Sequence, residues 1–430
     1  MSGYAEYREV NLPWLKAVPA HWEIRRNKNI FTEQKEIVGE RSADYTLLSL
    51  TLNGIIPRDM DGGGKFPESF DKYKIVKNGD MAFCLFDIDE TPRTVGLSGY
   101  NGMLTGAYTI MRVSNINARF IYYYYLALDN SKMLRPLYTG LRKTININTF
   151  QSTKVPVPPR EEQDQIVRFL DWKVSNINKL INIKQEQLRT VKELLDRLFR
   201  DTTSKCSKKV KIKYLFELDD DFFVPDASES YAKAGMYNRG RGIFLREPCL
   251  GNELGDSQFQ HIHSDCLMLS GQFAWEDAVY ITQEKDTHGI ASHRYYLLKP
   301  VRYIPVEYLW LYFLSGEGFF NLQQCSHGSA GRNRPLNIKE VLNLELPVPD
   351  DKEKANALNE LVRDYMRLQV ITEEEKKALL DFQTHLIADI VTGKIDVRGI
   401  EIPEYEFVDE DIDNADENLE QGADEPPKEE

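Results

Sequence analysis

The sequence has few cysteines, no Cys-x-x-Cys pair and no long apolar run. Its longest apolar stretches, such as 120–128, fall far short of the roughly 18 residues that a membrane helix needs. Residues 1–10 lack the basic-then-apolar pattern of a signal peptide. The 5 scattered cysteines exclude a disulfide framework and favour reduced thiols. We therefore expect a soluble cytoplasmic protein with no membrane partner.

Motifs for catalysis and metal binding are also scarce. One cluster has zinc-like ligands, namely His261, His263 and Cys266, but a surface turn leading into the strand 265–269 explains it better, because no second ligand pair is present. The segment 61–65 resembles a phosphate loop without the Ser or Thr that binds magnesium. There is no S-adenosylmethionine loop, nucleophile elbow or metalloprotease spacing. The sequence predicts a non-catalytic chain with no metal and no cofactor of its own.

Negative charge is concentrated at one end of the chain. In total, 54 Lys and Arg oppose 67 Asp and Glu, for a net charge of -13. Residues 396–430 hold 15 acidic and two basic side chains, so this stretch accounts for the whole net charge. Its few apolar residues cannot offset the entropy of folding. We expect an acidic tail over 396–430 that is disordered past about residue 409, attached to a neutral body.

The body is an internal duplication. Residues 140–147 match 331–338, and residues 155–158 match 346–349, both at an offset of 191. An aromatic segment upstream repeats at an offset of 188. Three matches in the same order, with compatible spacing, indicate two copies of one unit.

Each copy predicts an α+β domain followed by a long helix. Strand candidates with turn signals between them are 45–52, 80–85, 108–113, 266–269 and 294–298. The predicted divisions are a first α+β domain at 1–160, a central long helix at 161–204, a second α+β domain at 205–350, a C-terminal long helix at 351–395 and the tail at 396–430.

Both long helices carry an apolar stripe with alternating steps of three and four residues. In the first helix the stripe includes Val174, Ile177, Ile181, Lys184, Leu188, Val191 and Leu195. In the second helix, 191 residues later, it includes Leu368, Thr372, Glu375, Leu379, Phe382 and Leu386. Each stripe could pack on its own domain. A narrow stripe of this kind favours another helix, so we expect an antiparallel coiled coil between two domains related by a pseudo-twofold repeat.

Several motifs flank the repeats. They are VPAHWEI at 18–24, KNGDMAF at 77–83, VPVPPREEQ at 155–163 and LIADIVTGKIDV at 386–397. Together they resemble the DNA-specificity subunits of type I restriction-modification systems, over residues 18 to about 400. The second copy departs from the pattern, because residues 349–354 lack the Pro-Pro-x-x-Glu-Gln signature.

The resemblance implies a recognition subunit within a larger complex. Each target-recognition domain would read one half of a bipartite, asymmetric double-stranded DNA target, and the helices would set the gap between the halves. Two methyltransferase subunits would dock on the chain and methylate adenine with S-adenosylmethionine, which they would bind. A restriction (motor-nuclease) subunit could also join.

Basic residues in loops are the candidate DNA contacts. In the first domain they are Arg58, Lys65, Arg93, Arg142 and Lys143, and in the second Arg239, Arg241, Arg294, Arg332 and Arg334. Lys143 and Arg334 occupy equivalent positions in the repeat, which suits phosphate contacts shared by both copies. Arg239 and Arg241 have no counterpart and better suit base reading.

Two other functions fit the same patterns. A coiled-coil scaffold with two protein-binding domains would show no salt-dependent affinity for DNA. A nuclease or transferase without recognisable motifs would show turnover that depends on a metal or cofactor.

Overall fold

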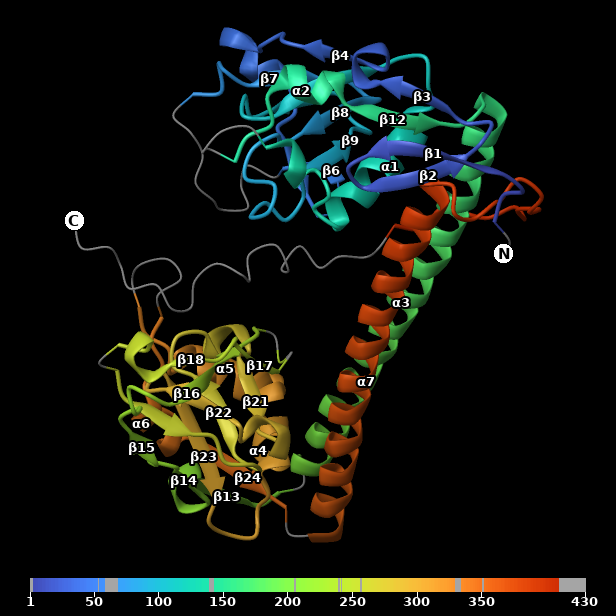
Figure 1. Cartoon of the computed structure of the whole chain (residues 1–430). Helices are drawn as coiled ribbons and strands as arrows, with labels where there is room; N and C mark the ends of the chain where they lie inside the picture. Colours follow the sequence, from blue (N-terminus) through green and yellow to red (C-terminus); the bar gives the residue numbers. More distant parts are fainter. Residues whose placement is uncertain are drawn as a thin grey trace. The chain divides into compact units, whose positions relative to one another are not determined.

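The computed structural model describes residues 3–52, 54–58, 69–138, 143–204, 206–238, 240, 242–255, 257–328, 334–349 and 352–409. The chain forms two compact units (Figure 1). The described residues of unit 1 are those up to 182 and those from 375 to 409, and unit 2 spans 183–374. Because each unit takes part of both long helices, the division runs through the helices and not at their ends.

The helices are α1 (Ala118–Asn130), α2 (Ile147–Ser152), α3 (Arg160–Thr203), α4 (Val306–Leu314), α5 (Gly316–Gln324), α6 (Ile338–Asn343) and α7 (Lys352–Val391). The repeated Asn-Ile dipeptide starts a short helix in each unit. The side chain of Asn146 accepts the N–H of Asn148 at the start of α2, and Asn337 does the same for Lys339 at the start of α6. An Asn in this position stabilises a helix start, which explains why this part of the repeat is shared.

Both units contain a four-stranded antiparallel sheet with the same strand order. The order is β4-β11-β8-β9 in unit 1 and β14-β23-β20-β21 in unit 2. The strands are β4 (Phe31–Gln34), β8 (Asp80–Phe83), β9 (Val95–Leu97), β11 (Thr109–Val113), β14 (Phe216–Leu218), β20 (Leu267–Ser270), β21 (Val279–Ile281) and β23 (Tyr295–Pro300). A matching two-stranded pair accompanies each sheet, β3 (Glu23–Arg26) with β12 (Lys154–Val157) and β13 (Lys208–Lys211) with β24 (Glu345–Val348).

The remaining strands differ between the units. Unit 1 has three antiparallel pairs: β1 (Tyr7–Leu12) with β2 (Leu15–Pro19), β5 (Leu48–Thr51) with β6 (Gly54–Pro57), and β7 (Lys74–Val76) with β10 (Gly102–Leu104). Unit 2 has instead one six-stranded sheet of β15 (Phe222–Phe223), β16 (Ser230–Met236), β17 (Ile243–Leu245), β18 (Cys249–Leu250), β19 (Phe259–His261) and β22 (Gly289–Ser292). The five predicted strands overlap β5, β8, β11, β20 and β23, and are confirmed.

Aromatic side chains form the centre of both cores. In unit 1, Phe83 of β8 lies 5.1 Å from Tyr125 of α1 and 4.8 Å from Phe150 of α2, measured between ring centroids. In unit 2, Phe199 of α3 lies 5.1 Å from Tyr308 of α4. Rings tilted at these separations add to the free energy of simple apolar burial.

Both long helices contribute to both cores. In unit 1 the start of α3 (Ile166, Leu170) joins the end of α7 (Ile390) in one hydrophobic cluster. In unit 2 the end of α3 (Leu195) joins the start of α7 (Leu358). Within each unit, therefore, an early part of one helix packs with a late part of the other.

The predicted stripe lies on the buried face of α3 but only partly on that of α7. In α3, Ile177, Ile181 and Leu195 are buried, and Val174, Lys184, Leu188 and Val191 are half-buried. In α7, Thr372 and Leu386 are buried and Leu379 is half-buried. The predicted positions Leu368, Glu375 and Phe382 are wrong, because they are exposed; the burial pattern continues through Val362, Gln369, Lys376 and Gln383. The seven-residue repeat therefore persists along α7, but each of these positions lies one residue after the predicted one.

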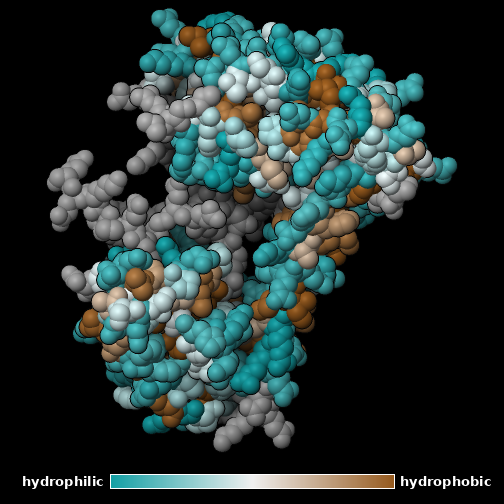
Figure 2. All heavy atoms as spheres, viewed as in Figure 1, coloured by the Kyte–Doolittle hydropathy of each residue, from teal (hydrophilic) through white to brown (hydrophobic). Residues whose placement is uncertain are grey.

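Several large apolar side chains remain at the helix surface. Figure 2 shows hydrophobic atoms among the hydrophilic ones along the long helices. In unit 1 these side chains include Leu180 and Phe382, and in unit 2 they include Ile183, Leu194, Leu361, Leu368 and Ile371. None of the described helices is both long and apolar enough to cross a membrane.

Residues 397–409, at the start of the predicted acidic tail, lie against α3. Polar side chains of α3 bind the main chain of residues 397–409: Gln165 Nε2 donates to the carbonyls of Val397 and Ile400, Ser175 Oγ to that of Glu406, Asn178 Nδ2 to that of Val408, and Asn182 Nδ2 to that of Asp409. These bonds hold residues 397–409 on α3, and the expectation of disorder concerns only residues past about 409. Val397 is buried in the core of unit 1, and Ile400 and Ile402 pack against that core. Residues 410–430 lie outside the described part.

Candidate DNA interface

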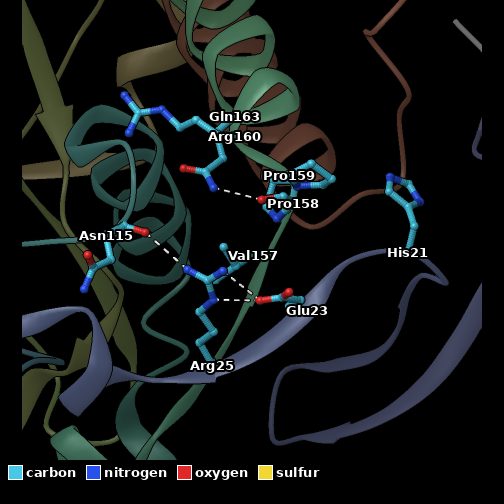
Figure 3. Close-up of a pocket in the computed structure, with 9 residues that line it drawn as sticks. All are labelled: His21, Glu23, Arg25, Asn115, Val157, Pro158, Pro159, Arg160 and Gln163. Atoms are coloured by element: carbon cyan, nitrogen blue, oxygen red, sulfur yellow. Dashed lines mark hydrogen bonds and ion pairs between the residues drawn. The ribbon is translucent and has the colours of Figure 1, made fainter.

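Unit 1 has a polar pocket where β12 turns into α3 (Figure 3). Its volume is about 410 Å³, and it is lined by His21, Glu23, Arg25, Asn115, Val157, Pro158, Pro159, Arg160 and Gln163. Arg25 donates to Glu23 at 2.8 Å and to the carbonyl of Asn115 at 3.2 Å. Arg160 pairs with Asp164 at 3.0 Å. Since acidic or carbonyl partners already engage both arginines, we assign no ligand to this pocket.

The motifs that carry the family resemblance meet beside this pocket. Glu162 is 5% exposed and accepts hydrogen bonds from Tyr4 Oη at 2.6 Å and Trp22 Nε1 at 2.9 Å. It also bonds His21 Nε2 at 2.7 Å. Gly393 has a φ of +80°, and a Cβ there would lie 3.3 Å from the Trp22 ring. The motif residues therefore fasten a structural corner of unit 1.

A turn after β8 holds Lys143, one of the predicted DNA contacts. The N–H of Asp87 donates to the carbonyl of Lys143 at 3.0 Å. Lys143 Nζ then pairs with Asp89 at 3.1 Å and Glu90 at 2.6 Å. Hydrogen bonds from Tyr138 and Lys143 lower the pKa of Asp89 to about 2. The charge of Lys143 is thus largely neutralised within unit 1.

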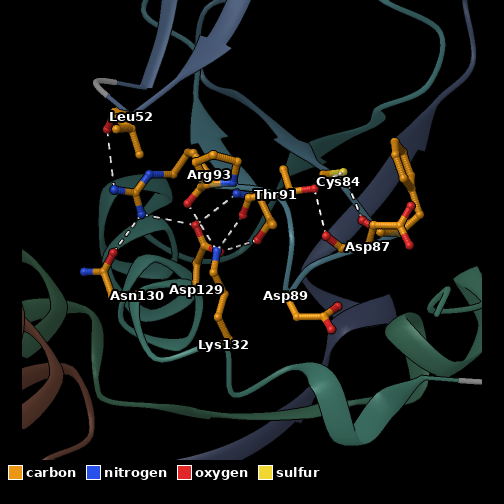
Figure 4. A network of polar contacts seen from close by, with 12 residues as sticks. Leu52, Cys84, Asp87, Asp89, Thr91, Arg93, Asp129, Asn130 and Lys132 are labelled. Atoms are coloured by element: carbon orange, nitrogen blue, oxygen red, sulfur yellow. Dashed lines mark hydrogen bonds and ion pairs between the residues drawn. The ribbon is translucent and has the colours of Figure 1, made fainter. Parts of the chain in front are cut away.

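Arg93, at the end of the same turn, was predicted to face DNA from a loop, but it lies in a network of polar side chains (Figure 4). Its guanidinium pairs with Asp129 at 3.1 Å and donates to Asn130 at 2.7 Å. Asp129 is fully buried and also accepts bonds from Thr94 and Lys132. Only 15% of the Arg93 side chain is exposed. These bonds make Arg93 a structural residue that ties the turn to α1, which corrects its prediction as a loop residue facing DNA.

Unit 2 has the corresponding turn after β20, which we call the 271–277 turn. The N–H of Gly271 donates to the carbonyl of Arg294 at 2.7 Å, and its carbonyl accepts the N–H of Leu336 at 2.8 Å. A Cβ at Gly271 would lie 2.6 Å from the Arg294 carbonyl oxygen, so only glycine permits this approach. The turn therefore brings together two segments that contain predicted DNA contacts.

Arg334 lies over an aromatic ring of this turn. Its guanidinium is 4.8 Å from the centroid of Trp275, and its side chain is exposed. Trp275 Nε1 donates to the carbonyl of Gln272 at 2.9 Å, which orients the ring. A cation held over an aromatic face keeps its full charge. Arg334 is therefore better suited to a phosphate contact than Lys143, its counterpart in unit 1.

A third segment reaches the same turn. The N–H of Gly240 donates to the carbonyl of Asp277 at 2.7 Å, and Asn238 Nδ2 donates to Glu276. The predicted contacts Arg239 and Arg241 flank Gly240 in sequence. Segments near residues 240, 294 and 334 thus converge on one turn of unit 2.

The other predicted DNA contacts have mixed outcomes. Arg58 is exposed, and its N–H donates to the carbonyl of Leu47 at 2.9 Å. Arg294 is half-buried. Predictions that lie outside the described residues are Lys65, Arg142, Arg239, Arg241 and Arg332.

The possible zinc ligands do not form a metal site. His263 bonds the carboxylate of Asp219, and His261 bonds Asp221 at 3.0 Å. Cys266 is buried, and burial raises the pKa of its thiol to about 11. The thiol is therefore protonated at neutral pH. Among the residues that the structure describes, no group of three His, Cys, Asp or Glu side chains could hold a metal ion.

A family model identifies the part of the chain that contains the Lys143 turn. Residues 70–190 match the model described as the type I restriction modification DNA specificity domain. Residues 70–190 form a type I DNA specificity domain. The match runs from the region of β7 to the middle of α3, so the specificity domain includes the buried Arg93 network.

Comparison with solved structures covers most of the chain, and one of them shares its fold. A structure from work on complex assembly and conformational transition of the type I R-M system aligns with 88% of this chain and 99% of its own, at 12% identity and a TM-score of 0.51. The HsdS subunit from Thermoanaerobacter tengcongensis has 10% identity and a TM-score of 0.40, covering 88% and 98%. The S subunit from M. genitalium has 14% identity and a TM-score of 0.41, covering 91% and 99%. No curated relative matches the chain by sequence.

Sequence reasoning missed the residues that organise the unit 2 counterpart of the specificity domain's turn. Trp275, Asp277 and Gln369 all contact predicted DNA segments. For Trp275 and Asp277, the sequence signal was their position in a short turn between two strands. Gln369 lies within α7, where no sequence signal distinguished it. Their partners lie at least 37 residues away in sequence, for instance Gly240 for Asp277, so no local pattern could reveal them.

Proposed function

We propose that this chain is the sequence-specific DNA recognition subunit of a type I restriction-modification complex. In this proposal each unit reads one half of a bipartite, asymmetric double-stranded target. The observation that carries it is the turn at the same place in both four-stranded sheets, after β8 and after β20, with a basic residue of the repeat beside each. Shared positions suit phosphate contacts, and different neighbouring side chains suit different half-sites.

In the same proposal, α3 and α7 form an antiparallel coiled coil that sets the gap between the half-sites. The packing of early with late helix segments inside each unit supports this arrangement. The 44 residues of α3 correspond to about 66 Å at 1.5 Å per residue. Two readers on one face of a duplex are separated by whole helical turns of roughly 34 to 36 Å, which a helix of this length can span.

We further propose that two methyltransferase subunits bind the exposed apolar side chains of the long helices, including Leu180, Phe382 and Leu194. Exposed apolar patches mark protein interaction sites. The methyltransferases would bind S-adenosylmethionine and methylate adenine, while this chain would contribute recognition and no chemistry. A restriction (motor-nuclease) subunit would join the same assembly in systems that cleave DNA.

Methylome sequencing tests the proposal directly. Cells expressing an adenine methyltransferase with this chain should acquire methylation at one bipartite, asymmetric motif, and cells without the chain should not. The purified complex should bind that motif with an affinity that falls steeply with salt. Equal binding to every duplex would contradict sequence-specific recognition. A complex with no salt-dependent affinity for DNA would favour a coiled-coil scaffold with two protein-binding domains.

A further inference from the structure

The hairpin loop between β16 and β17 is rich in glycine and is held by main-chain hydrogen bonds to other elements. Its sequence is Asn-Arg-Gly-Arg-Gly over residues 238–242. Gly240 and Gly242 have φ values of +65° and +101°, which strongly favour glycine. One main-chain bond closes the loop: the N–H of Tyr237 donates to the carbonyl of Gly242 at 2.9 Å. A Gly-rich loop of this kind has many accessible conformations unless other elements restrain it.

Two long-range main-chain bonds restrain the loop at Gly240. Its N–H donates to the carbonyl of Asp277 at 2.7 Å. Its carbonyl accepts a bond from Gln369 Nε2 of α7 at 3.2 Å. Both main-chain polar groups of Gly240 are therefore bound by elements distant in sequence, one from the 271–277 turn and one from a long helix.

An ion pair lies directly beside the same glycine. Lys192 Nζ of α3 is 3.2 Å from Asp277 Oδ2, and the two side chains are 32% and 19% exposed. A Cβ at Gly240 would be 3.5 Å from Asp277 Oδ2 and 3.9 Å from Lys192 Nζ. Burial raises the pKa of Asp277, which shows that this carboxylate is largely withdrawn from water. The ion pair therefore packs directly against Gly240.

We propose that Lys192, Asp277 and Gln369 are positioning residues that fix Gly240 and thereby position the hairpin loop between β16 and β17 to read one half of the DNA target. The inference rests on the proposed function and deepens it, because it names the loop and the side chains that determine specificity in unit 2. Two of the three belong to the long helices, so the spacer also braces the reading loop. Bracing lowers the entropy lost when the loop meets the base edges, and this gain appears only on the correct sequence.

Two variants of the full chain, in complex with the methyltransferase, test the proposal: Gln369→Ala and Lys192→Met. Amide hydrogen exchange of residues 237–242 should become about tenfold faster in both, because an opened peptide exchanges freely. The preference for the correct base pairs should fall about tenfold in one half of the target, while the other half and the gap stay unchanged. Lys192→Arg, which keeps the charge, should behave as the wild type.

Arg189→Met is the matched control, since Arg189 lies one turn earlier on α3 and pairs with Glu186 in an exposed position. It should change neither exchange nor specificity. Unchanged exchange in the two test variants overturns the bracing. Faster exchange with unchanged specificity, or with loss at both halves, overturns the role in reading. If the wild-type complex methylates no defined motif, the proposed function fails, whereas the exchange measurement still decides the bracing.

Discussion

The turns after β8 and β20 occupy the same place in two sheets of the same strand order, but they hold their basic residues by opposite means. In unit 1, Lys143 is paired with Asp89 and Glu90. In unit 2, Arg334 lies over Trp275 and retains its charge. The fold therefore repeats positions, while the neighbouring side chains decide whether the basic residue is paired with carboxylates or lies over an aromatic ring.

The surroundings of the two turns differ in the same way. The unit 1 turn is anchored to α1 by the buried Arg93–Asp129 network, whereas the unit 2 turn binds a hairpin loop and α3, and α7 binds that loop. Residues 1–160 contain 21 basic and 16 acidic side chains, against 13 and 19 in residues 211–350. In the proposed function, a region of negative net charge needs a local group of cations to bind DNA, and Arg334 beside the 271–277 turn is a candidate member.

The largest expected effect is on the anchor of the unit 1 turn. Asp129→Ala should lower the free energy of unfolding by about 3 to 5 kcal/mol, because it leaves Arg93 buried without its counter-charge. Urea unfolding followed by fluorescence measures the loss. The exposed Asp364→Ala, which breaks a pair with Arg367, serves as control and should change stability by less than about 0.5 kcal/mol. Equal losses would mean that the turn does not depend on the buried network.

A truncation separates the bound part of the C-terminal segment from the rest. A chain ending at Gly399 should lose about 2 kcal/mol of stability, because the bonds from Ser175, Asn178 and Asn182 disappear. A chain ending at Asp409 keeps these bonds and should unfold like the full chain. Identical unfolding of the two truncated chains would show that residues 400–409 contribute nothing to unit 1.

DNA binding compares the two equivalent cations directly. Arg334→Ala should weaken binding by about 1 kcal/mol on all sequences and lower the salt slope by about one, as expected for a phosphate contact. Lys143→Ala should do less, because its charge is already paired. Fluorescence anisotropy with cognate and scrambled duplexes, at several salt concentrations, provides the measurement. A loss restricted to the cognate duplex would contradict the phosphate assignment.

The smallest effects concern pH, and they should have opposite signs in the two turns. The pKa of Asp89 is lowered to about 2, so its bonds stabilise unit 1 above pH 4 and are lost as the pH falls toward 2. Burial raises the pKa of Asp277, so its contribution is present at low pH and is lost as the pH rises. From pH 3 to 6, Asp89→Asn should lose about 1 to 2 °C of melting temperature relative to wild type, and Asp277→Asn should gain. If the melting temperatures of both variants changed with pH in the same direction relative to wild type, the two carboxylates would not differ in the predicted way.

Much of the fold could be predicted from local pattern. The repeated Asn-Ile and Pro-Val-Pro segments, which indicated the duplication, lie at the starts of α2 and α6 and in β12 and β24, because caps and proline act on the residues beside them. The exposed Leu368 and Phe382 show where pattern alone misled, since a seven-residue repeat does not specify which face is finally buried. The binding of residues 397–409 to α3 was not predicted. It uses main-chain carbonyls, which are the same in every sequence.

The sequence by itself determined the duplication, the two long helices, the location of the acidic charge and the resemblance to one family, because these depend on spacing and composition. Only the tertiary structure decided which cations are free. Arg93 and Arg334 look alike in sequence, yet one is 15% exposed beside a buried carboxylate and the other is exposed over an indole ring. The reason is that a charge responds to whatever lies within a few ångströms, and here those neighbours are 36 and 59 residues away along the chain.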